Sequence, residues 1–236
     1  MKNTKRTEIW QIDLAQDVDL EQAMALLDRT ELQRARRFID SAHSRRFIVA
    51  HAALREILGR WLGREPGAID FELSAHGRPL LRNGGAVFSL SHSADMALCA
   101  VTSEGELGVD IERRRSLEHR ALGRRFFSAS EADALEELPE DEREAAFFDC
   151  WVRKEAYIKA KGLGLALALD SFALSVPARL GQRLYFSQRF PEDVARYQVM
   201  LLQAPVGYHA ALASPANDRG ETAYRFWSFG KGHLTQ

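Results

Sequence analysis

Two stretches of the chain carry the same features in the same order, and the second begins 100 residues after the first. Each stretch has a long helical pattern followed by a strand-like segment. The matched positions are Thr30-Glu31 with Ser130-Glu131, Phe47 with Phe148, Leu62-Gly63 with Leu163-Gly164, and Ile69 with Leu169. Such a repeat predicts an α+β fold of two similar halves with pseudo-two-fold symmetry. Each half is expected to pack one long helix on an antiparallel sheet.

The join between the halves is predicted near Ser103–Gly108, where a strand ends and a short polar segment follows. Residues 1–104 would form the N-terminal half and residues 105–236 the C-terminal half. A cleft between two such halves is a natural place for a ligand.

Periodicity and turn signals give the expected elements of each half. The first half is expected to hold strands over 8–14, 68–74, 77–81, 86–91 and 96–103, with helices over 20–38 and 44–63. The second half is expected to hold strands over 106–112, 171–176, 182–187, 197–202, 209–214 and 224–229. Between the first two of these strands lie an acidic helical region, with Ser130 as a possible N-cap, and a helix that includes Cys150 and runs on to Gly162 and Gly164.

Composition narrows the class of protein. The 32 basic and 33 acidic side chains nearly cancel, which argues against bulk nucleic-acid binding. The two cysteines, Cys99 and Cys150, have apolar neighbours and are expected to be buried free thiols. No apolar run reaches the length of a membrane span, and the N-terminal residues do not resemble a signal peptide. We therefore expect a cytoplasmic protein that binds neither membranes nor nucleic acid.

The segment GVDIE brings two carboxylates to one face of a predicted strand. Because side chains alternate along a strand, Val109 and Ile111 would face the core while Asp110 and Glu112 point the other way. A hard divalent cation between the two carboxylates would relieve their repulsion. The plainer alternative is an edge strand with a solvated polar face.

The helical segment CWVRKEAYIKAK places Glu155 and Lys159 four residues apart on one face. This pair alone could be a surface salt bridge of little energetic weight. The repeat argues for more, because the matching positions in the first half are Leu54 and Leu58. Charged residues at positions where the other half has core leucines indicate a candidate functional site.

The segment FSLSHS offers hydroxyls and an imidazole. Alternation puts Ser89, Ser91 and Ser93 on one face of a strand and His92 on the other. No G-x-S-x-G motif occurs, so a serine hydrolase is poorly supported. Phosphate binding and a purely structural polar strand end both remain open.

Arginines could supply further phosphate contacts in the first half. The candidates are Arg34, Arg36, Arg37, Arg45, Arg46 and Arg78. Most would serve equally well on a solvated helix face, whereas Arg78 stands between a glycine and a proline that restrict its backbone.

Taken together, these motifs resemble those of the 4'-phosphopantetheinyl transferase superfamily, in its single-chain, surfactin-synthetase-activating type. The segments that carry the resemblance are HGRP, SLSHS, GVDIE, FFSASE, WVRKEAYIK and KGLGL, in this order. Each motif is weak alone, but their order and spacing over Arg34–Phe172 are specific. One departure is the arginine of HGRP, where lysine is common in the family.

The resemblance implies transfer of the phosphopantetheine arm of coenzyme A to a serine of an apo carrier protein, with release of adenosine 3',5'-bisphosphate. The implied Mg²⁺ ligands are Asp110, Glu112 and Glu155, and the implied catalytic residues are Asp110, Glu155 and Lys159. Lys159 would contact the pyrophosphate, and Glu155 is also a candidate to help deprotonate the carrier serine. The implied coenzyme A contacts are Arg34, Arg46, Arg78, Ser91, His92 and Lys159.

The resemblance also suggests partners. Carrier proteins of this system are acidic around their modified serine, so the arginine-rich strip Arg113–Arg125 is a hypothetical docking site. A solvated charge run is the alternative. The sequence leaves open whether the carrier serves fatty-acid, polyketide or nonribosomal peptide synthesis. A monomer is expected because both halves lie in one chain. The rival functions are a metal-dependent nuclease and a module that binds coenzyme A or a carrier without catalysis.

Overall fold

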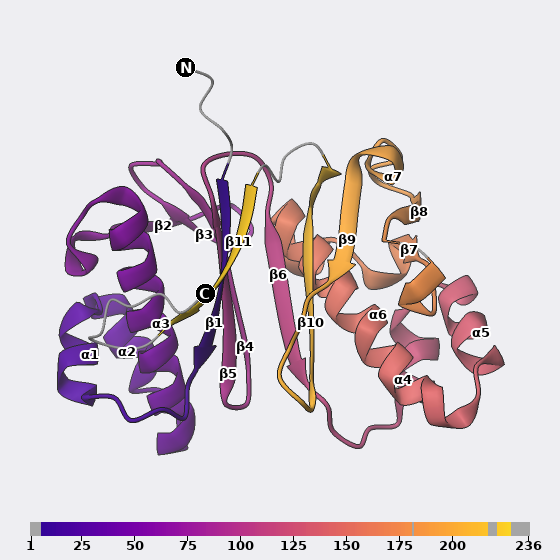
Figure 1. The fold of residues 1–236 in the computed structure, drawn as a ribbon, viewed down its shortest axis with the longest axis horizontal. Helices are drawn as coiled ribbons and strands as arrows, with labels where there is room; N and C mark the ends of the chain where they lie inside the picture. The colour runs from indigo at the N-terminus through magenta and orange to yellow at the C-terminus, as the bar shows by residue number, and fades with distance from the viewer. Residues whose placement is uncertain (1–5, 181, 217–220, 228–236) are drawn as a thin grey trace.

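Two β-sheets stand side by side in the middle of the molecule, with helices on the outer sides (Figure 1). The computed structural model describes residues 6–180, 182–216 and 221–227. The first sheet has the order β11 (Glu221–Trp227), β1 (Arg6–Asp13), β5 (Met96–Thr102), β4 (Val87–Ser93), and the second β6 (Gly108–Arg113), β10 (Tyr208–Pro215), β9 (Tyr197–Leu201). Two hairpins complete the strands, β2 (Phe71–Leu73) with β3 (Pro79–Leu81) and β7 (Phe172–Leu174) with β8 (Leu184–Ser187).

A long helix follows the opening elements of each half. The helices are α1 (Leu20–Leu26), α2 (Arg29–Ala35), α3 (Ser41–Leu62), α4 (His119–Phe126), α5 (Ala129–Glu137), α6 (Glu140–Lys161) and α7 (Asp193–Arg196). Helices α3 and α6 each have 22 residues and end at a glycine in the left-handed conformation, which glycine adopts without steric penalty. The expected mixture of helices and antiparallel strands is confirmed.

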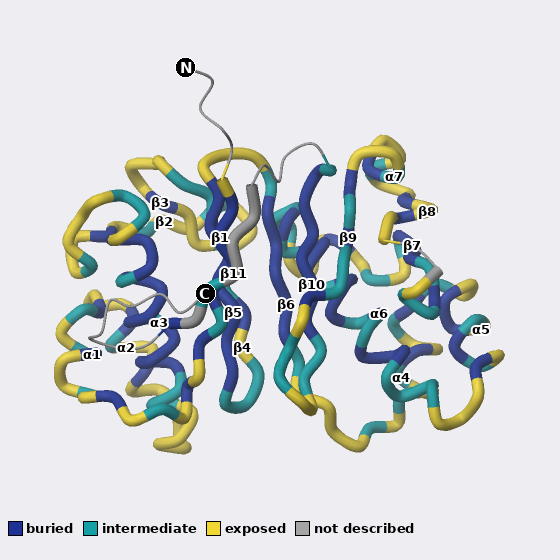
Figure 2. Tube along the Cα trace, viewed as in Figure 1, coloured by how far each residue is buried: buried dark blue, intermediate teal, exposed yellow. Residues whose placement is uncertain are grey.

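The core forms where the long helices meet the sheets. Apolar residues of α3 pack with those of β1 and β5 in one cluster, and apolar residues of α6 pack with those of β9 and β10 in another. The central strands are largely buried, whereas the short outer helices keep exposed sides (Figure 2). Cys99 and Cys150 are both free and buried, as expected. No helix in the described ranges combines the length and hydrophobicity needed to cross a bilayer.

Some predicted boundaries are wrong, because local capping overrides a continuous helical pattern. The helix expected over 20–38 is two helices, since Asp28 caps α2 with its side chain. Helix α5 is capped by Ser128 and not by Ser130, because Ser128 and Glu131 form a reciprocal capping box. The strand expected over 224–229 overlaps β11, and its last two residues lie outside the described ranges.

A buried ion pair fastens the short second helix of each half to the long helix. In the first half, Arg55 Nε donates to Glu31 Oε2 at 2.7 Å. In the second half, Lys154 Nζ lies 2.8 Å from Glu131 Oε2. Both glutamates also close the capping box of their helix. The two halves therefore share a local construction.

These shared contacts correct the register between α3 and α6. Their C-cap glycines, Gly63 and Gly162, are 99 residues apart, and so are the two buried cations. The predicted match of Glu155 with Leu54 assumed a spacing of 101 and is wrong by two residues. The error arose because the prediction matched Gly63 with Gly164. The glycine that caps α6 is Gly162, two residues earlier.

The two sheets meet at a seam between β4 and β6 that is bridged by side chains. These strands belong to different sheets, so no backbone ladder joins them. Each serine hydroxyl of β4 accepts a hydrogen bond from a backbone N–H of β6. The pairs are Ser89 with Val109, Ser91 with Ile111, and Ser93 with Arg113. The predicted alternation of serines along this strand is confirmed.

Candidate functional site

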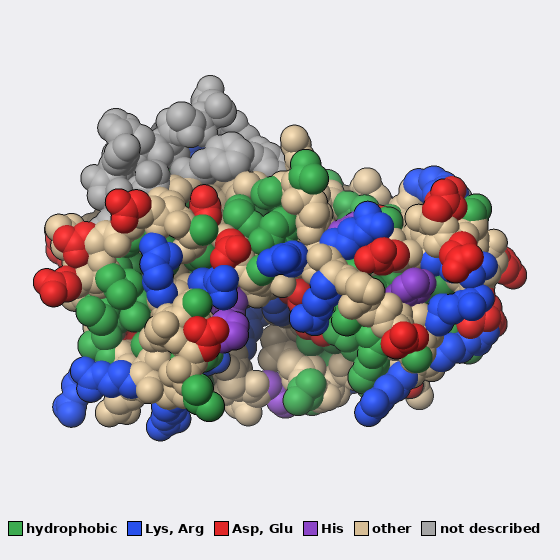
Figure 3. Space-filling model, turned by 90° about the horizontal axis from the view of Figure 1, so that it is seen from below, with side chains coloured by type: hydrophobic (Ala, Val, Ile, Leu, Met, Phe, Trp, Pro, Cys, Tyr) green, Lys and Arg blue, Asp and Glu red, His purple; other side chains and the backbone are tan. Residues whose placement is uncertain are grey.

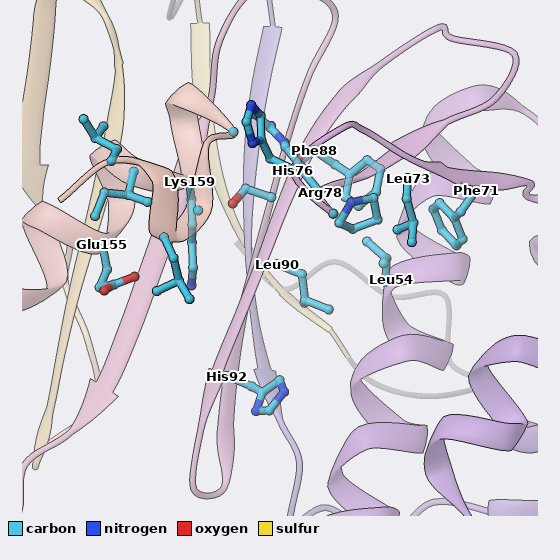
Figure 4. Close-up of a pocket in the computed structure, with 18 of the residues that line it drawn as sticks. Leu54, Phe71, Leu73, His76, Arg78, Phe88, Leu90, His92, Glu155 and Lys159 are labelled. Atoms are coloured by element: carbon cyan, nitrogen blue, oxygen red, sulfur yellow. The ribbon is translucent and has the colours of Figure 1, made fainter. Parts of the chain in front are cut away.

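A cavity of about 1060 Å³ lies between the two halves. Its walls come from α2, α3, the β2–β3 hairpin, β4, and the C-terminal part of α6 with the loop that follows. Figure 3 shows the surface hollowed between the two sides of the molecule, with Lys and Arg side chains near the hollow. The side chains in Figure 4 come from both halves, with Glu155 and Lys159 on one side and Leu54 and Phe71 on the other. The predicted cleft is thus present.

Lys159 and Asp110 form the central polar contact of the site. Lys159 Nζ donates to Asp110 Oδ1 at 2.6 Å and to Ser91 Oγ at 2.7 Å. Asp110 is only 3% exposed, and its Oδ2 atom is buried without a hydrogen-bond partner. A buried carboxylate oxygen without a partner is costly, so this atom has capacity for a ligand.

Glu112 and Glu155 add two carboxylates beside Asp110. Burial raises the pKa of Glu155, the neighbouring Asp110 carboxylate raises it further, and Lys159 acts in the opposite direction. Burial also raises the pKa of Glu112, while a hydrogen bond from Ser93 lowers it. The three acids therefore form a negatively charged site, with Lys159 paired to Asp110 and Arg115 also acting on Glu112.

The three carboxylates suit a hard cation by type, because oxygen ligands are what Mg²⁺ prefers. The partnerless Oδ2 of Asp110 supports this fit. Within the described residues, however, no three His, Cys, Asp or Glu side chains are already arranged as metal ligands. Lys159 is instead the partner of Asp110.

Among the residues expected to contact phosphates, Arg34 and His92 line the cavity. The Arg34 guanidinium lies 5.3 Å from the ring centre of Phe47. Partial desolvation at the cavity wall lowers the pKa of His92, and its electrostatic interactions with His51 and Lys159 lower it further. This lowering of the pKa favours the neutral imidazole of His92.

The other expected phosphate contacts have protein partners in the structure. Arg46 pairs with Asp95 at 2.7 Å and does not line the cavity. Arg78 does line it, but its guanidinium donates to three backbone carbonyls, those of Phe88, Leu107 and Ala160, each at 3.1 Å. The hydroxyl of Ser91 is buried against Asp110 and Lys159.

Comparison with known proteins identifies the family. The family model "4'-phosphopantetheinyl transferase superfamily" matches residues 106–213. The 4'-phosphopantetheinyl transferase HetI of Nostoc sp. (strain PCC 7120) is 40% identical over 164 residues, covering 67% of this chain and 69% of HetI. The 4'-phosphopantetheinyl transferase psf-1 of Bacillus pumilus is 32% identical over 79% of this chain and 76% of psf-1. Sfp of Bacillus subtilis (strain 168) is 29% identical over 84% and 86%.

The chain belongs to the 4'-phosphopantetheinyl transferase superfamily. The expected resemblance is confirmed, including the surfactin-synthetase-activating type. The part of the chain that matches the superfamily model holds Asp110, Glu112, Glu155 and Lys159. The basic cavity wall of the first half lies outside that part, and so do Ser91 and Ser93.

Two residues of this transferase-family site were missed from the sequence. His51 lines the cavity, stacks on Phe47 with ring centres 4.0 Å apart, and has Nδ1 2.7 Å from Glu31 Oε1. Its position four residues after Phe47, on the same helix face, was the available signal. Ser93 was placed on the correct face but given no role, although its hydroxyl donates to Glu112 Oε2 at 2.7 Å.

Proposed function

We propose that this chain transfers the 4'-phosphopantetheine arm of coenzyme A to a serine of an apo acyl or peptidyl carrier protein, in a Mg²⁺-dependent reaction that releases adenosine 3',5'-bisphosphate. One observation carries the proposal. In a chain of this superfamily, Asp110, Glu112, Glu155 and Lys159 converge from a strand and a helix beside a large cavity between the halves.

Asp110, Glu112 and Glu155 would hold the Mg²⁺ ion. When bound, the ion neutralises charge on pyrophosphate oxygens as the leaving group departs. The fit of these residues is supported by the partnerless Oδ2 of Asp110. Coenzyme A would lie in the cavity, with Arg34 and His92 as the first candidates for its phosphates. Arg46, Arg78 and Ser91 are weaker candidates, because each has a protein partner.

The carrier serine is the nucleophile, so the chain must accept its proton and stabilise the leaving group. Glu155 is the candidate base, because a raised carboxyl pKa makes a carboxylate a better proton acceptor at neutral pH. Lys159 would provide positive charge to the leaving bisphosphate. As the serine oxygen bonds to the β-phosphorus of coenzyme A, the bond from that phosphorus to the bridging oxygen breaks. The charge then remains on the bisphosphate.

The division of labour between the halves is part of the proposal. Residues 1–104 would supply the phosphate contacts, and residues 105–236 the carboxylates and the lysine. The shared ion pairs, Glu31 with Arg55 and Glu131 with Lys154, favour the pseudo-two-fold relation between the halves. We expect a monomer that works in the cytoplasm.

The arginine-rich strip after β6 is the proposed carrier-docking surface. Arg124 is already bound by Glu136 and Asp133, so reversing its charge would bring three carboxylates together. Arg113 and Arg125 are exposed and form no ion pair with a described residue. The variant Arg113→Glu is therefore expected to raise KM for the carrier and to leave KM for coenzyme A unchanged, because Arg113, unlike Arg125, does not line the cavity. An unchanged KM for the carrier would remove this surface from the proposal.

The proposed function is tested by intact-mass spectrometry. A panel of apo carriers for fatty-acid, polyketide and peptide synthesis is incubated with the protein, coenzyme A and Mg²⁺. The Glu155→Gln variant and an EDTA sample are the controls. A mass gain of one phosphopantetheine that disappears in both controls is expected, and it would name the carrier. Binding of coenzyme A without a mass gain on any carrier would favour a non-catalytic module.

A further inference from the structure

The seam between β4 and β6 places serine hydroxyls against the carboxylates of the site. Two of the seam hydroxyls make a second contact besides the backbone N–H described above. Ser91 Oγ donates to Asp110 Oδ1 and Ser93 Oγ donates to Glu112 Oε2, each at 2.7 Å. In both cases the hydroxyl accepts from the amide of one residue and donates to the carboxylate of the residue before it.

In this arrangement the Ser93 hydroxyl both donates and accepts a hydrogen bond. A serine hydroxyl has one hydrogen to donate and two lone pairs to accept with. For Ser93, the acceptor contact to the Arg113 N–H fixes the oxygen, and the hydrogen is then directed at Glu112. Hydrogen bonds to a carboxylate are short and strong, so each one restricts the rotation of the carboxylate that it contacts.

We propose that Ser93 is a positioning residue of the transfer site, because its hydroxyl orients the Glu112 carboxylate for the cation. Ser91 does the same for Asp110. The hydroxyls that join the two sheets thus also set the geometry of the cation ligands. This inference rests on the proposed function, since it assigns to Ser93 a role in that same site.

The chain contains a matched control in the same seam. Ser89 Oγ accepts the N–H of Val109 at 3.1 Å, the same distance as in the Ser93–Arg113 pair. The residue before Val109 is Gly108, which has no side chain to orient. Glycine is required there because a Cβ atom would lie 2.0 Å from the Ala156 carbonyl oxygen of α6. Ser89→Ala therefore removes a seam hydrogen bond but no contact to a carboxylate.

The experiment measures cation binding directly. Mn²⁺ is titrated into the full chain in the presence of coenzyme A, and free Mn²⁺ is followed by electron paramagnetic resonance. Ser93→Ala is expected to raise the Mn²⁺ Kd about 10-fold, a typical effect of removing a partner of a metal ligand. Ser93→Thr keeps the hydroxyl and should bind nearly as the wild type does, and Ser89→Ala should leave the Kd unchanged.

Thermal melting in EDTA separates positioning from stability. Ser93→Ala and Ser89→Ala each lose one seam hydrogen bond, and Ser93→Ala also loses the bond to Glu112, so Ser93→Ala should lower Tm somewhat further. In a Glu112→Gln background, Ser93→Ala should cause no further change in Mn²⁺ Kd, because no carboxylate remains to be oriented. If Ser93→Ala does not fold, Ser93→Cys takes its place, since its weak thiol donor should raise the Kd in the same direction.

Two results would overturn the inference, and they differ from failure of the proposed function. An unchanged Mn²⁺ Kd in Ser93→Ala would reduce Ser93 to a residue of the seam alone. An equal rise in Ser89→Ala would assign the effect to the seam as a whole. If the wild type binds coenzyme A but no Mn²⁺, the proposed cation site itself fails, and this inference fails with it.

Discussion

At the scale of single residues, the site holds carboxylates where burial disfavours their charged form. Glu112 and Glu155 are half-buried beside Asp110, and Lys159, which lies among these acids, pairs with Asp110. Burial and the neighbouring carboxylates raise the pKa of both glutamates. The folded chain therefore carries an electrostatic cost that a bound cation would relieve.

This cost predicts a stability gain in Glu155→Gln. The pKa of Glu155 lies above its ordinary value of 4.5, so the folded state binds the proton more tightly than the unfolded chain does. Stability then falls as pH rises from about 4.5 through the folded pKa, and the whole cost is present above it. Without metal at neutral pH, the variant should have a higher Tm, by about 2–4 °C for each kcal/mol removed.

The same variant should lose transfer by at least about 100-fold, the range for a missing acid–base group. Melting curves in EDTA at pH 4 and pH 7.5 check the stability gain. The curves of variant and wild type should coincide at pH 4 and separate at pH 7.5. A variant that is less stable than the wild type at pH 7.5 would contradict the argument.

Strand alternation and helix spacing predicted which acids share a face, and the resemblance to the transferase family was needed to predict that the strand and the helix contribute to one site. The partners of Arg78 and Ser91 could not be predicted. Arginine or serine in a motif can bind a phosphate or a backbone group equally well, and the choice depends on carbonyls and amides from distant segments. For Arg78 these carbonyls belong to residues up to 82 positions away.

At the scale of elements, buried charge decides how helices attach. Lys154 and Glu131 are both fully buried, and Lys154 Nζ also donates to the carbonyls of Leu169 and Phe172. Removing one partner leaves a buried charge uncompensated, which costs about 3–5 kcal/mol. Lys154→Met should therefore lower the free energy of unfolding in urea by this amount. The exposed Arg36→Met is the control, expected to change it by less than about 0.5 kcal/mol.

The Arg78 guanidinium joins β4, the segment before β6 and the end of α6. Lysine cannot reproduce a planar fork that reaches three carbonyls. Arg78→Lys should therefore destabilise the protein by about 1.5–3 kcal/mol, the scale of hydrogen bonds to a charged group, while the Kd for coenzyme A changes little. Urea unfolding and calorimetric titration distinguish this from a phosphate contact, for which affinity would fall and stability would hold.

The long helices were predictable from their apolar periodicity and their terminal glycines, but the register between them was not. What repeats between the halves is a buried acid with a cation from the long helix, in one half arginine and in the other lysine. Apolar and glycine pairs are too frequent to fix a register. A charged pair with different residue types in the two copies gives little sequence signal.

At the scale of the whole molecule, the last described strand belongs to the first half. Strand β11 pairs in parallel with β1, whereas β9 and β10 pair beside β6. Parallel pairing across more than 200 residues has no local pattern to predict it. The notion of two antiparallel halves therefore misses that the first sheet is mixed.

Removal of β11 should weaken the first half. Trp227 is 7% exposed and its Nε1 donates to Glu56 of α3 at 2.8 Å. Deleting residues 217–236 would remove this side chain and leave β1 as an exposed edge. The expected loss is at least about 3 kcal/mol, as for truncation of a buried tryptophan. Trp227→Phe is the milder variant, and hydrogen exchange at the amides of β1 reports the effect. Unchanged exchange in the deletion would contradict it.

Because β11 is the last described strand of the chain but belongs to the first sheet, dividing the chain has a specific consequence. A cut in the connection between β5 and β6 would leave the first fragment without a strand of its sheet, because the second fragment carries it. Reassembly would also have to rebuild the serine contacts between β4 and β6. The first fragment could then not complete its sheet alone, and its folding would be coupled to association with the second fragment. The chain is therefore a natural scaffold for a two-fragment reporter whose signal is the return of phosphopantetheine transfer.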